Sequence, residues 1–313
     1  MARFDLQNKT IFVAGHNGMV GSALCRALQK LPVNILTANK DELDLLNEGA
    51  VKSWMAQHKP NAVILAAARV GGIFANDTYP VDFLLQNLKI QNNVIEAAHQ
   101  QNISKLLFLG SSCIYPKRAQ QPIKEDYLLT APLEPSNEWY AIAKIAGLKL
   151  CQAYRKQYGS DFISAMPTNL YGPNDNFHPE HSHVPAALLR RFHEAKEASK
   201  GEVLVWGTGK PRREFLHVDD LASACIHLLQ NYSDIEPVNI GTGEDISIAD
   251  FAERIAEVVG YSGKIGYDES KPDGTMLKRL DVSKINTIGW SASINLADGL
   301  KSTYEWAVSN NVF

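Results

Sequence analysis

The sequence of 313 residues lacks the marks of several protein classes. It holds four cysteines, Cys25, Cys113, Cys151 and Cys225, and no CxxC pair, so neither a dense disulfide framework nor a structural zinc site is expected. No stretch approaches the ~18 consecutive apolar residues of a membrane helix. The first ten residues lack the apolar segment of a signal peptide. We therefore expect a cytoplasmic protein with reduced thiols and no membrane partner.

An excess of charge of one sign is also absent. Lys plus Arg number 31 and Asp plus Glu 34, which leaves a formal net charge of −3 and no long basic run. This balance gives little support to nucleic-acid binding, and we expect no nucleic-acid partner. Hydrophobic residues make up 45% and charged residues 21% of the chain, so it can bury an ordinary globular core.

Short apolar runs alternate with helix-period segments over the first half of the chain. The expected strands are Thr10–Gly15, Val33–Thr37, Asn61–Ala67, Lys105–Ser111 and Phe162–Met166, with a further one at Val238–Gly241. The expected helices between them are Gly18–Lys30, Glu48–His58, Val81–Gln101 and Glu138–Tyr158. Strands rich in Val, Ile and Leu that alternate with helices predict an α/β fold with a doubly wound parallel (Rossmann) sheet, covered on both faces.

The pattern becomes irregular after Met166. Pro167–His183 has the composition of a loop. Beyond it we expect helices at Val184–Ala198, Asp219–Gln230, Ser247–Val259 and Leu296–Ser309, and short strands at Val203–Trp206 and Phe215–Val218. The prediction is a nucleotide-binding domain of residues 1–171 plus 214–242, and a smaller, discontinuous substrate lobe of residues 172–213 plus 243–313.

Three glycines, Gly15, Gly18 and Gly21, lie between the first strand and the first helix. Glycines in this strand–turn–helix context let the backbone approach a pyrophosphate, and the start of the helix offers it free N–H groups. NAD enzymes usually carry an acidic residue after the second strand to bind the ribose 2′-hydroxyl. Here Lys40 stands at that place, which favours NADP(H); it could also be a solvated loop lysine.

Tyr140 and Lys144 are four residues apart on an expected helix and so share one face. A lysine beside a phenol favours the phenolate by charge, and we expect it to lower the pKa of Tyr140. Such a tyrosine can pass a proton to a carbonyl oxygen while a hydride reaches carbon. Ser111 ends the fourth strand, where its hydroxyl can reach the same oxygen. The spacing recurs at Tyr267 and Lys271, in a segment that we interpret as a loop without this role.

These features together resemble the extended short-chain dehydrogenase/reductase family. Within it, longer segments look like the GDP-L-fucose synthases, and the resemblance spans nearly the whole chain. The segments are Leu65–Ile73, Gly110–Pro116, Pro167–Pro173, Asp175–Pro179, Ser182–Val184, Arg213–Asp220 and Lys271–Thr275.

This resemblance implies an enzyme that epimerises GDP-4-keto-6-deoxy-D-mannose at C3 and C5 and reduces C4 with NADPH, giving GDP-L-fucose. It implies that Cys113 and His183 move the protons at C3 and C5, with either residue acting as acid or base. Both carbons adjoin the C4 ketone, so their protons are acidified through an enolate. Ser111 and Tyr140 would stabilise the enolate oxygen and later protonate the C4 oxygen.

The resemblance also implies which residues line the ligands. The cofactor would contact Gly15, Asn17, Gly18, Met19, Val20, Gly21, Lys40, Leu45, Ala66, Ala67, Leu109, Gly110, Ser111, Ser112, Tyr140, Lys144, Pro167, Asn169, Leu170 and His183. The GDP-sugar would contact Arg191, Trp206, Arg213 and Lys278. Asn17 departs from the arginine common at this place in bacterial members, where that arginine would assist in binding the 2′-phosphate of NADPH. A homodimer is implied, packed through Val81–Gln101 and Glu138–Tyr158.

Other interpretations remain open at this point. A sister enzyme of the GDP-L-colitose synthase type would use the same acid and base. A nucleotide-sugar 4-epimerase would not need Cys113 and His183. A non-catalytic dinucleotide sensor would keep the glycine turn but would not need Ser111, Tyr140 and Lys144 in register. His178, His181 and His183 lie close in sequence, but no carboxylate or cysteine at ligand spacing accompanies them, and we expect no metal. His217 is expected to begin a helix.

Overall fold

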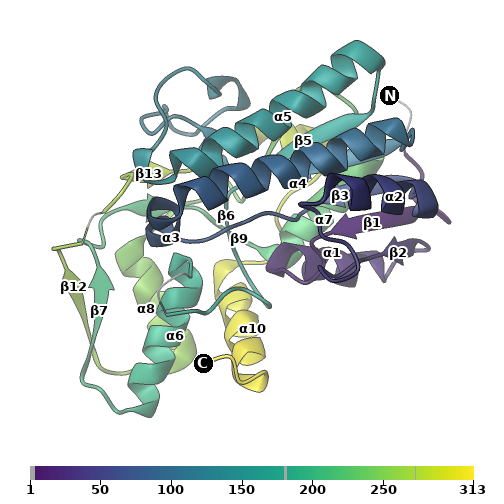
Figure 1. The fold of residues 1–313 in the computed structure, drawn as a ribbon. Helices are drawn as coiled ribbons and strands as arrows, with labels where there is room; N and C mark the ends of the chain where they lie inside the picture. Colours follow the sequence, from purple (N-terminus) through teal and green to yellow (C-terminus); the bar gives the residue numbers. More distant parts are fainter. Residues whose placement is uncertain (1–3, 180–181, 272) are drawn as a thin grey trace.

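The computed structural model describes residues 4–179, 182–271 and 273–313. Its centre is a six-stranded parallel sheet with the strand order β10-β5-β4-β3-β1-β2 (Figure 1). The strands are β1 (Thr10–Ala14), β2 (Asn34–Leu36), β3 (Ala62–Leu65), β4 (Lys105–Leu109), β5 (Phe162–Pro167) and β10 (Val238–Ile240). The chain leaves β1 toward β2 on one side and returns to β3 on the other, so ligand crevices are expected at the carboxyl ends of these strands. The predicted doubly wound sheet is confirmed.

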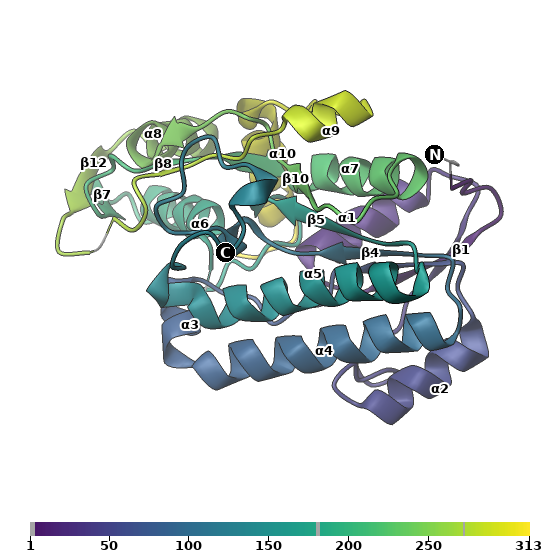
Figure 2. The same cartoon turned by 90° about the horizontal axis from the view of Figure 1, so that it is seen from above.

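Helices cover both faces of the sheet, as Figure 2 shows. One face carries α1 (Met19–Leu28), α7 (Val218–Asn231) and α9 (Ser283–Ile288). The other carries α2 (Glu48–His58), α4 (Pro80–Gln100) and α5 (Glu138–Tyr158). Successive strand residues point to opposite faces, so Ile11 packs in the first cluster and Phe12 in the second. Both faces are apolar, which explains the continuous hydrophobic runs of the strands.

A third apolar cluster lies at one end of the sheet (Figure 1). It is built on α6 (Val184–Glu197), α8 (Ile248–Val259) and α10 (Leu296–Ser309), together with β7 (Glu202–Trp206), which pairs with β12 (Lys264–Asp268). Two further small sheets join it to the main sheet. They are β8 (Arg212–Arg213) with β11 (Ile246–Ser247) and β13 (Leu277–Lys278), and β6 (Asn169–Tyr171) with β9 (Phe215–His217).

Two predicted loops are wrong in part. The Pro- and Asn-rich stretch 167–183 contains β6, because Asn169–Tyr171 pairs in parallel with β9. Tyr267 lies on β12 rather than in a loop, because that strand pairs with β7 far from it in sequence. In both cases the partner strand supplies backbone hydrogen bonds that local composition does not reveal. His181 and Pro272, which belong to predicted segments, lie outside the described residues.

Several short helices and strands were not predicted from the sequence. They are α3 (Ile73–Thr78), α9, β8, β11, β12, β13 and the 3-10 turns η1 (Ser112–Ile114), η2 (Glu125–Tyr127) and η3 (Pro135–Asn137). The expected start of a helix at His217 is confirmed, since its side chain accepts a hydrogen bond from the Asp219 N–H as the N-cap of α7. Among the described residues, no helix is long and apolar enough to cross a membrane.

Candidate active site

The glycine turn between β1 and α1 is packed so closely that side chains do not fit at two of its positions. Gly15 has a φ of +91°, and a Cβ there would lie 2.7 Å from the backbone of Ala67. A Cβ on Gly21 would lie 2.0 Å from the carbonyl oxygen of Gly15. Gly18 differs, because the nearest atom to its Cβ would be 3.6 Å away. The turn therefore packs against itself on one side and is open at Gly18.

Gly18 is also the N-cap of α1, and no side chain caps this helix end. The first N–H groups of a helix have no intrahelical partner, and the helix dipole favours an anion beside them. The open turn therefore fits the pyrophosphate of a dinucleotide. Lys40 is exposed in the turn after β2, where a cation could meet a 2′-phosphate.

The remaining predicted cofactor residues follow the carboxyl ends of neighbouring strands. Ala66 and Ala67 come after β3, and Gly110 and Ser111 come after β4. A side chain at Gly110 would displace Met166, because its Cβ would lie 2.3 Å from the sulfur of that residue. The other positions lie at the start of α1 (Asn17, Met19, Val20), after β2 (Leu45), on β4 and η1 (Leu109, Ser112), and on β5 and β6 (Pro167, Asn169, Leu170).

Tyr140 and Lys144 lie on α5, the helix whose predicted bounds the structure reproduces. Lys144 is buried and its Nζ donates to the carbonyl oxygen of Leu109 at 2.8 Å. The same ammonium lies 5.8 Å from the centre of the Tyr140 ring. Burial lowers the pKa of Lys144 to about 7.

The expectation that Lys144 lowers the pKa of Tyr140 is wrong. Burial raises the pKa of the phenol, the neighbouring Cys113 raises it further, and a hydrogen bond with Ser111 lowers it only in part. The reason is that the phenolate loses hydration in the crowded crevice, although part of the Tyr140 side chain still reaches solvent. Tyr140 therefore stays a neutral phenol, which is the form that can donate a proton.

Cys113 lies on η1, immediately after Ser111 and Ser112. Its N–H donates to the Ser111 Oγ at 3.2 Å, and the Lys278 Nζ lies 3.7 Å from its Sγ in a hydrogen bond. Ser111, Cys113 and Tyr140 thus form one cluster beyond the end of β4. The thiol is half-buried rather than enclosed in a core.

His183 is the N-cap residue of α6. The residue as a whole is exposed, but the protein around its ring reduces the hydration of the charged form, and this lowers its pKa. A histidine in this state is neutral at neutral pH and can accept a proton.

The predicted substrate residues form two pairs. Arg191 on α6 donates to the Leu204 carbonyl at 2.7 Å, and its guanidinium lies 5.3 Å from the centre of the exposed Trp206 ring. Arg213 on β8 lies opposite Lys278 on β13 in the strand register. Burial lowers the pKa of both arginines, but an arginine remains charged at neutral pH. Arg191 and Arg213 can therefore offer positive charge to phosphate groups, whereas the Lys278 ammonium is hydrogen-bonded to Cys113.

Glu214, a fully buried carboxylate next to Arg213, was not among the residues predicted from the sequence. It accepts hydrogen bonds from the Gly243 and Leu280 N–H groups, each at 2.8 Å. Burial raises its pKa, and these donors oppose the rise. A charged residue directly before the apolar strand Phe215–His217 was the available signal.

Asn137 was also missed. It precedes α5, three residues before Tyr140, and its Oδ1 is buried with no hydrogen-bond partner among the described residues. An unpaired buried oxygen at this place could accept a hydrogen bond from a bound hydroxyl.

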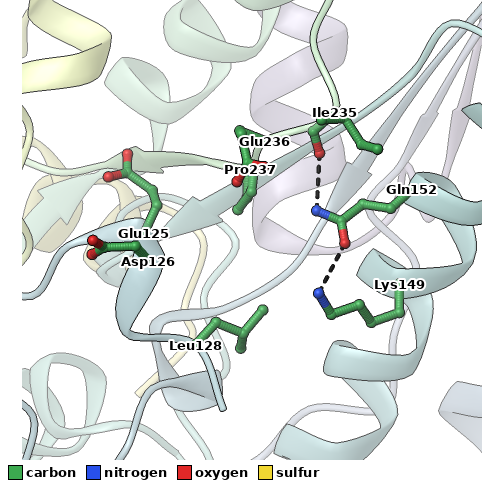
Figure 3. A pocket seen from close by; sticks show the side chains of 8 residues that line it. All are labelled: Glu125, Asp126, Leu128, Lys149, Gln152, Ile235, Glu236 and Pro237. Atoms are coloured by element: carbon green, nitrogen blue, oxygen red, sulfur yellow. Dashed lines mark hydrogen bonds between the residues drawn. The ribbon is translucent and has the colours of Figure 1, made fainter. Parts of the chain in front are cut away.

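A separate pocket lies on the far half of α5 and does not belong to this cluster. It is lined by Glu125, Asp126, Leu128, Lys149, Gln152, Ile235, Glu236 and Pro237 (Figure 3). Lys149 donates to the Gln152 side chain, which in turn donates to the Ile235 carbonyl. Three carboxylates against one ammonium do not suit a diphosphate, so this pocket is not the candidate site.

Residues 11–241 match the NAD dependent epimerase/dehydratase family. GDP-L-fucose synthase 1 of Arabidopsis thaliana is 61% identical over 301 residues, which covers 96% of this chain and 93% of that protein. GDP-L-fucose synthase of Escherichia coli (strain K12) is 53% identical over 315 residues, covering 97% and 98%. GDP-L-colitose synthase of Yersinia pseudotuberculosis is 39% identical over 299 residues, covering 95% and 97%.

Two solved structures share the whole fold. A GDP-6-OMe-4-keto-L-xylo-heptose reductase from C. jejuni superposes with a TM-score of 0.92 at 39% identity, covering 99% of this chain and 100% of that one. A GDP-L-fucose synthetase from Naegleria fowleri bound to NADP superposes with a TM-score of 0.91 at 28% identity, covering 99% and 98%.

Proposed function

The chain belongs to the NAD dependent epimerase/dehydratase family, and we propose that it is an NADPH-dependent GDP-L-fucose synthase. It converts GDP-4-keto-6-deoxy-D-mannose to GDP-L-fucose by epimerisation at C3 and C5 and reduction at C4. One observation carries the proposal. The thiol of Cys113 lies in the same cluster as Ser111 and Tyr140, in a chain that relatives of this name match over 96% and 97% of its length.

NADP(H) fits the glycine turn, because the turn is open at Gly18 and the start of α1 offers uncapped N–H groups. Lys40 would hold the 2′-phosphate, and the residues after β3, β4 and β5 would line the nicotinamide side. When bound, this cofactor supplies the hydride that reduces C4. The NADP-bound neighbour of similar fold supports the assignment.

The epimerisation needs groups that remove and return protons beside a ketone. Cys113 and His183 are the candidates, because a thiol and an imidazole can each take up and return a proton. Burial lowers the pKa of His183, which leaves its ring neutral and able to accept one. The hydroxyls of Ser111 and Tyr140 would hydrogen-bond the C4 oxygen and stabilise the enolate that forms when a C–H bond breaks.

The reduction needs a proton at the C4 oxygen. Tyr140 can donate it, because burial keeps its phenol protonated. Lys144, held against the end of β4 by its bond to the Leu109 carbonyl, would orient Tyr140 and the cofactor ribose beside it. We assign Arg191, Trp206, Arg213 and Lys278 to the GDP-sugar. The two arginines would meet its phosphates, since arginine can donate twice to a phosphate, and Lys278 would lie beside the sugar ring, next to Cys113.

A GDP-L-colitose synthase is the second candidate, because a protein of that name matches 95% of this chain. Its 39% identity is lower than the 61% and 53% of the two fucose synthases, which favours the first candidate. The sugars differ at C3, so substrate competition separates the two enzymes.

We also propose a homodimer formed through α4 and α5. These helices pack side by side, and their outer surface exposes apolar side chains that water does not favour: Val81, Leu85, Trp139 and Ile142. The domain boundaries at residues 171/172, 213/214 and 242/243 and the cytoplasmic location stay predictions.

The direct experiment incubates purified protein with GDP-4-keto-6-deoxy-D-mannose and either NADPH or NADH. We expect oxidation of NADPH and a product with the NMR couplings of GDP-L-fucose. Absence of turnover with both cofactors would refute the proposal, and turnover of the 3-deoxy substrate instead would establish the colitose enzyme.

A further inference from the structure

Lys278 contacts the thiol of Cys113 from a segment 165 residues away in the sequence. The donor Nζ lies 3.7 Å from Sγ, and the contact is partly buried. Charges that are partly removed from water interact more strongly than charges in bulk solvent. An ammonium at this distance can therefore stabilise negative charge that forms on the sulfur while a proton is transferred.

The backbone under Lys278 is fixed rather than free to swing. Its carbonyl accepts a hydrogen bond from the Glu214 N–H at 3.3 Å, and the Leu280 N–H donates to the Glu214 carboxylate at 2.8 Å. Glu214 is fully buried. Two hydrogen bonds with Glu214, which lies between β8 and β9, thus hold the backbone at Lys278 and just after it.

The other charged or titratable groups near the thiol do not take this role. Tyr140 on α5 is a neutral phenol, because burial raises its pKa. Lys144 lies 5.8 Å from the centre of the Tyr140 ring and donates a hydrogen bond to the Leu109 carbonyl, and burial lowers its pKa to about 7. Lys278 is therefore the cation bonded to the sulfur in the described part of the site.

We propose that Lys278 is a positioning residue that stabilises the thiolate of Cys113 during proton transfer, an inference that rests on the proposed epimerisation. When a C–H bond beside the C4 ketone breaks, its electron pair enters the enolate and the proton joins the sulfur as S–H. When the S–H bond breaks instead, the proton goes to the ring carbon and the thiolate remains beside the ammonium. Lys278 therefore serves the transfer in either direction.

The test measures alkylation of Cys113 by iodoacetamide without substrate, followed on the Cys113 peptide by mass spectrometry. Lys278→Met should slow alkylation at pH 7 about tenfold, since only the thiolate reacts, and should leave the rate at pH 10 near that of the wild type. Lys278→Arg should restore most of the rate at pH 7. Lys264→Met removes an exposed lysine on β12 and is the matched control, expected to behave as wild type.

An unchanged rate at pH 7 in Lys278→Met would overturn the proposal, and so would an equal loss at pH 7 and pH 10, which indicates altered access rather than charge. In Lys278→Met, the rate of deuterium incorporation from solvent into the keto-sugar should fall at pH 7, as the alkylation rate does. Incorporation at the wild-type rate would show that Lys278 has no part in the epimerisation. If the wild-type protein does not act on the keto-sugar at all, the proposed function fails, whereas the alkylation result still decides the effect of Lys278 on the thiol.

Discussion

Replacing Gly21 by alanine is expected to destabilise the fold, whereas the same change at Gly18 should weaken cofactor binding and leave the fold intact. A Cβ on Gly21 would lie 2.0 Å from the Gly15 carbonyl oxygen and 2.6 Å from the His16 Cα. Both are backbone atoms in a tight turn, so they cannot rotate away. A Cβ on Gly18 would meet nothing nearer than 3.6 Å.

The magnitudes follow from these contacts. Overpacking costs typically 1–3 kcal/mol, and a clash with backbone belongs at the upper end, so we expect Gly21→Ala to cost about 3 kcal/mol. For a chain of this length that corresponds to a fall of about 5 °C in Tm. Gly18→Ala should cost less than about 1 kcal/mol, the difference between glycine and alanine at an N-cap. Its methyl group would project to where the pyrophosphate is expected, and we expect NADPH to bind at least about tenfold more weakly, or about 1.4 kcal/mol.

The assay combines thermal unfolding followed by circular dichroism with titration of NADPH fluorescence. The two variants are each other's control, because each adds one methyl group to the same turn. Wild-type NADPH affinity in Gly18→Ala would refute the placement of the pyrophosphate. Equal losses of Tm in both variants would refute the packing argument.

Three further predictions concern the catalytic cluster and the outer helices. Tyr140→Phe should lower NADPH oxidation by about 10²- to 10⁴-fold and slow sugar proton exchange less, whereas Cys113→Ser should abolish exchange; equal loss of both activities in Tyr140→Phe, or wild-type exchange in Cys113→Ser, would contradict this division. Burial holds the pKa of Lys144 at about 7 in the folded state, below that of an unfolded lysine, so the unfolded state binds more protons above pH 7 and stability should rise with pH. In chemical denaturation, the free energy of unfolding of the wild type should therefore rise relative to that of Lys144→Met by up to about 1.4 kcal/mol per pH unit between pH 7 and pH 10. A difference between the two proteins that does not change with pH would contradict the burial argument. Trp139→Glu should convert the dimer to a monomer in light scattering, whereas Val308→Glu, on an exposed part of α10, should not; a monomeric wild type would exclude the dimer.

Much of the nucleotide-binding half could be predicted because its signals are local. The bounds of α2 and α5 match the predicted ones, since each helix has a cap or a stop beside it: Asn47 accepts from the Ala50 N–H, and Gly159 ends α5 in the left-handed region. The short strands β8, β11, β12 and β13 were missed, because strands of two to five residues carry little periodic pattern and form only against a distant partner.

The direction in which the pKa of Tyr140 shifts was not predictable from the spacing of Tyr140 and Lys144 either. The four-residue separation from Lys144 places the two groups on one face, but how far each is buried depends on α4, β4 and η1 packing around α5. Burial disfavours the charged form of both groups, so it raises the pKa of Tyr140 and lowers the pKa of Lys144. The attraction between the two charges therefore does not decide the direction of either shift.

The sequence by itself determined the alternation of strands and helices, the glycine turn at the start of α1, and the pairing of Tyr140 with Lys144 on one helical face. Each of these depends on residues within a few positions of one another, where the periods of helix and strand fix the geometry. Only the tertiary structure decided that Lys278 meets Cys113, that Glu214 holds β13 in place, and that Tyr140 stays protonated. Those outcomes depend on contacts between distant segments and on the water they exclude, which no local spacing contains.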